Sequence, residues 1–101
     1  TTEDHMDDRE LYIKKMQARL DEWRAEIIRL KARGSGASAD VQLDINRQVR
    51  LLEHNVEEGK AKLSELASAG EDAWESIKEG VESAWDSLKS GVADAAAKLK
   101  G

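Results

Sequence analysis

Apolar side chains recur every three or four positions along almost the whole chain, which is the spacing of one face of an α-helix. In residues 9–33 the steps alternate between 3 and 4, as in the a/d seam of a coiled coil. Residues 40–69 carry a second seam of the same kind. We therefore predict helices over both ranges. Their seams are Ile13, Met16, Leu20, Trp23, Ile27 and Leu30 in the first, and Ile45, Val49, Leu52, Val56, Gly59, Leu63 and Leu66 in the second.

The third stretch, residues 72–99, is built on an eleven-residue repeat. AWESIKEGVES is followed by AWDSLKSGVAD and then by the shorter AAAKLK. Eleven residues make about three helical turns, so equivalent positions share one face of a helix. We predict a third helix over this range. Its apolar face is the candidate interaction or lipid-binding face, formed by Trp74, Ile77, Val81, Trp85, Leu88, Val92 and Leu99.

Small residues interrupt the first pattern at residues 34–38, which read Gly-Ser-Gly-Ala-Ser. We predict a turn here, in which Gly34 takes the left-handed conformation that commonly ends a helix. Either Ser38 or Asp40 is the expected N-cap of the second helix. No strand precedes this glycine-rich turn and no Gly-Lys-Ser/Thr follows it, so it does not have the pattern of a phosphate-binding loop.

Residues 67–72 are the second joint. Gly70 is expected to end the second helix, and Asp72 with Glu75 gives a capping pattern for the third. The chain contains no proline, however, and most residues of this joint tolerate a helix. One continuous helix over about 40–100, about 90 Å long, is therefore an open alternative.

The three predicted helices are similar in length, which favours an all-α fold in which they form an antiparallel three-helix bundle, or coiled-coil hairpin. Folding the chain about its two joints brings Leu20 near Leu52 on one side and Leu88 opposite Leu52 on the other. Leu52 thus lies where three seams meet. In the alternative, a hairpin with the long helix 40–100 exchanges its third segment with a second copy in a dimer.

Composition and charge narrow the classes of function. The chain has 101 residues, enough for one domain, which we place at residues 9–101; the acidic residues 1–8 form a predicted flexible tail. Charged residues make up 37% of the chain and the net charge is −5, which disfavours nucleic acid as a partner. The absence of cysteine excludes disulfides and thiolate chemistry.

No set of residues has the spacing of a catalytic or metal site. His5 stands among Asp4, Asp7 and Asp8, but these spacings match no defined metal-binding loop. His54 has no nucleophile and acidic orienter beside it in the pattern, and we expect it on the surface. We therefore predict that the chain is not an enzyme and takes no cofactor or metal.

Two segments carry a resemblance to known families. LDEWRAEIIRLKA at 20–32 and AWESIKEGVESAWDSLKSGV at 73–92 resemble a widespread bacterial family of small coiled-coil proteins, often described as stress-response or uncharacterised. The resemblance implies a cytoplasmic helical protein and offers no catalytic residues to carry over. The KEGV at 78–81 and KSGV at 89–92 are similar to the eleven-residue repeats of synucleins and exchangeable apolipoproteins, whose helices bind lipid surfaces.

Two hypotheses of function follow. In the first, the chain is a helical module for self-association, as a dimer, or for binding another helical protein, with the stress-related role that the resemblance implies. In the second, the third helix detaches and binds a membrane surface through its tryptophan-bearing face. Both use the same apolar residues, so the sequence alone leaves the choice open.

Overall fold

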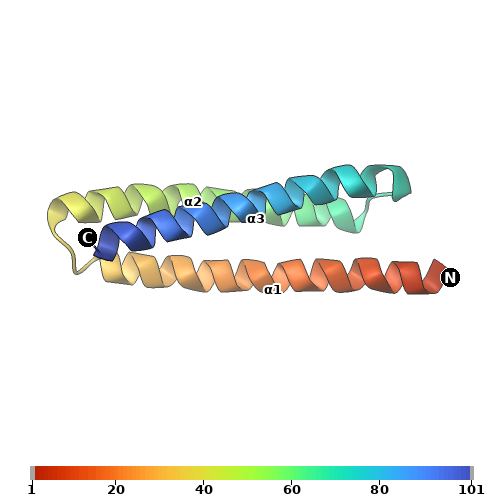
Figure 1. Ribbon diagram of the computed structural model, residues 1–101, viewed down its shortest axis with the longest axis horizontal. Helices are drawn as coiled ribbons and strands as arrows, with labels where there is room; N and C mark the ends of the chain where they lie inside the picture. Colours follow the sequence, from red (N-terminus) through yellow and green to blue (C-terminus); the bar gives the residue numbers. More distant parts are fainter. Residues whose placement is uncertain (1, 101) are drawn as a thin grey trace.

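The computed structural model describes the backbone of residues 2–100 and the side chains of residues 8–100. It contains three helices in this range: α1 at Thr2–Gly34, α2 at Ala39–Ala67 and α3 at Glu71–Lys100. Successive helices run in opposite directions and form an elongated bundle of 57 × 18 × 17 Å (Figure 1). The predicted all-α three-helix bundle is confirmed. The single chain described here does not have the continuous helix over 40–100, because the backbone turns back between α2 and α3.

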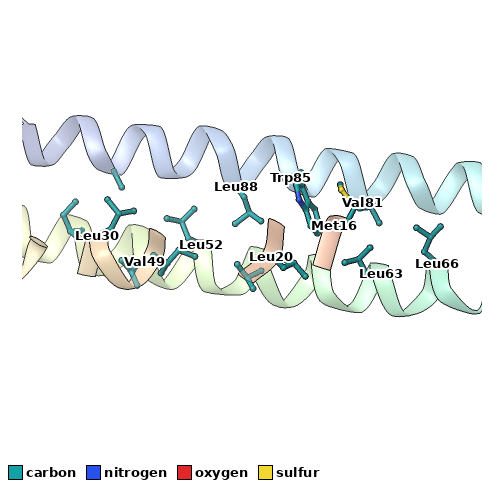
Figure 2. Close-up of a cluster of buried hydrophobic side chains, with 14 of the residues drawn as sticks. Met16, Leu20, Leu30, Val49, Leu52, Leu63, Leu66, Val81, Trp85 and Leu88 are labelled. Carbon is teal, nitrogen blue, oxygen red and sulfur yellow. The ribbon is translucent and has the colours of Figure 1, made fainter. Parts of the chain in front are cut away.

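The core runs along the bundle axis and consists of the predicted seams (Figure 2). Its most deeply buried large side chains include Ile45, Leu52, Leu66 and Leu88. Four predicted core residues are only partly buried and pack against the edge of the core: Ile13, Trp23, Ile77 and Val92. Ala95 is fully buried although the prediction omitted it.

The first helix begins earlier than predicted. α1 starts at Thr2 rather than at residue 9, so the backbone of the acidic segment continues the helix. Carboxylates near a helix N-terminus interact favourably with the helix dipole, and no proline or glycine interrupts this segment. Its predicted flexibility stays a prediction, and the His5 side chain lies outside the described residues.

The turn between α1 and α2 differs from the prediction at Gly34. No described glycine has a positive φ, so the left-handed conformation predicted for Gly34 is wrong. Gly34 is instead the last residue of α1 and is buried, and a Cβ atom there would lie 2.7 Å from Cγ2 of Ile45. Glycine is needed here for close helix approach. Ser38 occupies the N-cap position of α2, as predicted, with φ −61° and ψ 159° and without a side-chain capping bond.

The register between α1 and α2 is displaced by about one heptad from the predicted one. Leu20, predicted to lie near Leu52, reaches Gly59 instead, where its Cδ2 atom is 3.5 Å from the position that a Cβ would take. The reason is visible in the turn, which passes the end of α1 before α2 begins (Figure 1). The first turns of α2 therefore project beyond α1. The Gln42 side chain steadies this path by donating a hydrogen bond to the Ser35 carbonyl at 2.9 Å.

The joint between α2 and α3 also differs in detail. The carbonyl of Gly70 accepts hydrogen bonds from the amides of Ala73 and Trp74 at 3.2 and 3.1 Å, so Gly70 is the N-cap residue of α3. It does not end α2, which stops at Ala67. Asp72, the predicted cap, lies inside the first turn of α3, where its charge favours the helix dipole.

Candidate interaction face

The apolar face of α3, defined above by Trp74, Ile77, Val81, Trp85, Leu88, Val92 and Leu99, points into the bundle. Trp74, Val81, Trp85 and Leu88 are buried, and the other three residues pack against the core while partly exposed. The structure therefore brings together all seven predicted residues on one side of α3. Their present partners are the side chains of α2 and α1 (Figure 2).

Two close contacts fit α3 to α2. A Cβ atom at Gly59 of α2 would lie 2.9 Å from Cζ3 of Trp85, so the indole ring occupies the space that a side chain would fill. In the reverse direction, a Cβ at Gly91 of α3 would lie 2.5 Å from Cδ2 of Leu52. On each helix, a glycine thus leaves the space that a large side chain of the other helix occupies. The α2–α3 contact is specific in shape as well as apolar.

A cluster of aromatic and charged side chains joins α3 to α1 near the N-terminal end of α3. The Arg9 guanidinium lies over the Trp74 ring, 4.7 Å from its centroid. The Tyr12 ring meets Trp74 edge-on with centroids 6.0 Å apart, and its hydroxyl donates a hydrogen bond to Oε1 of Glu82 at 3.3 Å. The Lys78 ammonium lies 5.1 Å from the centroid of Tyr12. We call Arg9, Tyr12, Trp74, Lys78 and Glu82 the α1–α3 cluster.

The sequence prediction treated Tyr12 only as a flank of the first seam and did not identify this cluster. A signal was present, because Arg9 and Tyr12 are one turn apart and so share a side of α1. What the sequence does not contain is the axial offset that places them beside Trp74. Cation–π and exposed hydrogen-bond contacts of this kind each contribute about 1 kcal/mol or less.

Tyr12 carries the one resolved pKa shift among the described residues. Burial, and then the negative charge of Glu82, raises its pKa from 10.0 to about 12. Because the unfolded chain loses this proton first, the stabilising contribution of neutral Tyr12 is present below about pH 10 and is lost as pH rises towards 12.

The chain contains a single tyrosine, so its ultraviolet titration reports on Tyr12 alone. We expect phenolate absorbance to appear with a midpoint near pH 12 in the folded chain and near 10.0 in denaturant. Glu82→Gln is expected to lower the folded midpoint, since it removes the charge but keeps the side chain's size. A folded midpoint equal to that in denaturant would show that Tyr12 is not packed against α3.

The remaining surface shows little sign of chemistry. Among the described residues, no group of histidine and acidic side chains is arranged to hold a metal ion. His54 is exposed, as predicted, but its Nε2 lies 2.9 Å from Oε1 of Glu58, an acidic neighbour that the prediction did not include. An open groove between α1 and α2 is lined by apolar side chains, Ile27, Ile28 and Val56, and by the Arg24–Glu57 ion pair.

Four large aliphatic side chains stand mostly in solvent, all on α1 and α2: Leu11, Ile28, Leu43 and Leu51. Single exposed residues of this kind are common on soluble domains and define no site by themselves. No helix in the described part of the chain is apolar over enough residues to cross a membrane.

Comparison of the chain with protein-family models, curated proteins and solved structures gives no match. The resemblance to bacterial coiled-coil proteins therefore stays a prediction. The site is interpreted from its own geometry, which is that of an amphipathic helix seated in the groove between two others.

Proposed function

We propose that this chain is a non-enzymatic module that recognises amphipathic helices and self-associates through that recognition. The observation that carries the proposal is the packing of the Trp85 ring against Gly59 of α2, where the ring occupies the space that a larger residue's side chain would fill. Helix-in-groove recognition uses anchors of this type, spaced by three, four and seven residues. On α3 the buried residues with this spacing are Trp74, Val81, Trp85 and Leu88, at steps of 7, 4 and 3.

The groove that α1 and α2 present to α3 is filled by the chain's own helix. A helix of the same pattern from a second copy has the same anchors, and so competes for the same groove. Another protein's helix would need equivalent anchors. This favours a second copy as the partner, because its α3 has the same residues as the helix that already packs in the groove.

Sedimentation equilibrium of the unmodified chain tests the proposal. We expect a reversible monomer–dimer equilibrium whose dimer fraction grows with protein concentration between micromolar and millimolar. The monomer has a mass of 11.2 kDa, so the two species are well separated. A single monomeric mass over the whole range would overturn the proposal.

The lipid-binding hypothesis has less support. Its contact residues Trp74, Val81, Trp85 and Leu88 are buried against α1 and α2, so lipid binding requires α3 to leave its groove first. Association with a second copy through α3 also requires this step, but it restores the contact of Trp85 with Gly59, which a lipid surface does not provide. The bacterial, cytoplasmic and stress-related roles rest on the resemblance alone.

A further inference from the structure

If α2 and α3 were joined into one straight helix, the buried residues of both would lie on the same side of it. Leu63 and Val81 are separated by about five whole helical turns, and Leu52 and Leu88 by about ten. At about 100° per residue, all buried residues of both helices fall within one sector of about 100°. A hairpin does not need this agreement, because each of its helices can turn about its own axis. One straight helix over 39–100 does need it.

The joint, residues 68–70, is not helical in the structure, but no residue in it has the left-handed conformation that would exclude a helix. Ser68, which follows α2, has φ −106° and ψ 5°, and no described residue has a positive φ. A Cβ atom at Gly70 would meet nothing within 4 Å, so a side chain at this position has no steric obstacle. The Ser68 amide bonds to the Glu65 carbonyl at 3.2 Å, a bond that a continuous helix would replace with its regular one.

The α2–α3 contacts pair residues that lie at nearly equal distances from the joint. Lys62 meets Gly80, and further out Leu52 meets Gly91. Two straight helices that cross antiparallel at the joint reproduce these pairs between chains, with a two-fold axis at the crossing. Each α1 then keeps its own α2 and packs against the partner's copy of α3.

From the shared phase, the helix-compatible joint and the symmetric pairing, we infer that two copies of this chain exchange α3, with α2 and α3 of each copy joined into one continuous helix. This inference rests on the proposed function and deepens it: the partner is a second copy, and the interface is the α2–α3 contact of the monomer. The joint acts as the hinge between the closed monomer and the exchanged dimer.

Two substitutions at the hinge push the equilibrium in opposite directions. Gly70→Ala favours the continuous helix, because alanine is the better residue inside a helix and the poorer one at an N-cap. We expect it to raise the dimer association constant about tenfold or more, since each dimer contains two such sites. The open space around Gly70 means that alanine also fits the closed monomer.

Glu71→Pro is the opposing variant. Position 71 is the first residue of α3, where proline is well tolerated because that amide has no partner within the helix. In a continuous helix the same proline would clash with the preceding turn and remove a hydrogen bond. We expect it to lower the association constant by about a hundredfold or more while the closed monomer keeps its circular dichroism spectrum and melting temperature.

The test places one cysteine in each of two chains, Lys62→Cys in one and Gly80→Cys in the other, in a sequence that has no cysteine of its own. These positions face each other, because a Cβ at Gly80 would lie 3.2 Å from Cδ of Lys62. The two chains are mixed at high concentration and oxidised, and the disulfide between positions 62 and 80 of different chains is measured by mass spectrometry.

Exchange predicts that this disulfide forms, that Gly70→Ala in both chains increases its yield, and that Glu71→Pro nearly abolishes it. Equal yields in all three backgrounds would overturn the inference, because contact between closed monomers does not depend on the hinge. A dimer seen by sedimentation without the disulfide would also overturn it, while leaving self-association standing. Absence of any dimer would remove the proposed function and the inference together.

Discussion

Leu52→Asp is expected to unfold the bundle. Leu52 is 2% exposed and lies between α1 and α3, where its Cδ2 atom comes close to Gly91. The substitution removes a buried leucine, which costs about 3 kcal/mol, and adds a buried carboxylate without a partner, which costs several more. Together these effects are comparable to the whole stability of a small domain, about 5–15 kcal/mol.

The neighbouring Leu51→Asp is the matched control. Leu51 is 58% exposed, so the same change of charge and size takes place in solvent. We expect its melting curve by circular dichroism to stay within a few degrees of that of the unmodified chain, while Leu52→Asp shows little helical signal at any temperature. Similar melting curves for the two variants would mean that α2 faces the core with a different side.

Gly59→Leu is expected to produce the second largest loss of stability, because the leucine side chain would displace the Trp85 ring from its contact with α2. Even a single Cβ at position 59 would lie 2.9 Å from Cζ3 of Trp85, and a leucine adds three more carbon atoms. Overpacking of this kind costs about 3 kcal/mol, and the neighbouring Leu20 leaves little room for the ring to move. Chemical denaturation of the variant measures the loss directly.

Two further variants make this result specific. Gly80→Ala is the control, because the nearest atoms belong to the flexible end of Lys62, and alanine should stabilise α3 by about 0.5–1 kcal/mol. Trp85→Ala combined with Gly59→Leu is expected to lose less stability than the two single changes added together, since the leucine partly fills the cavity that removal of the indole ring leaves, and the clash between them is gone. Additive losses would show that Gly59 and Trp85 do not touch.

The fold class could be predicted because it depends on periodicity, which the sequence contains in full. Steps of three and four identify which side of each helix is apolar, and most predicted seam residues are indeed in the core. Leu52 is buried and Leu51 is exposed for this reason alone. The α2–α3 pairing was predicted only to within about one helical turn, because the joint between these helices is short. Leu52 was predicted to lie opposite Leu88 but reaches Gly91, three residues further along α3.

The α1–α2 register could not be predicted in the same way. A slide of seven residues keeps every a and d position inside, so the seams of α1 and α2 fit equally well one heptad apart. The path of the turn decides between the two, and that path depends on local contacts such as the bond from Gln42 to the Ser35 carbonyl. The close approach of Gly34 to Ile45 follows from the same path.

The α1–α3 cluster was missed for a related reason. α1 and α3 are not neighbours in sequence, so no turn fixes their axial offset, and they meet through long side chains more than through closely packed backbones. Tyr12 belongs to the edge of the first seam, and only the three-dimensional offset places it against Trp74 and Glu82. Contacts at the edge of a seam are thus harder to predict than those at its centre.

We propose that the apolar face of α3 binds helices and not lipid. It is tested most directly with the Trp23→Phe variant, in which Trp74 and Trp85 are the two remaining tryptophans and both lie on that face. The variant is titrated with neutral and anionic phosphatidyl lipid vesicles that carry brominated acyl chains, which quench tryptophan on contact. The account predicts unchanged emission at every lipid concentration. Quenching that grows with added lipid would contradict it, because the face of α3 would then have left the bundle for the membrane.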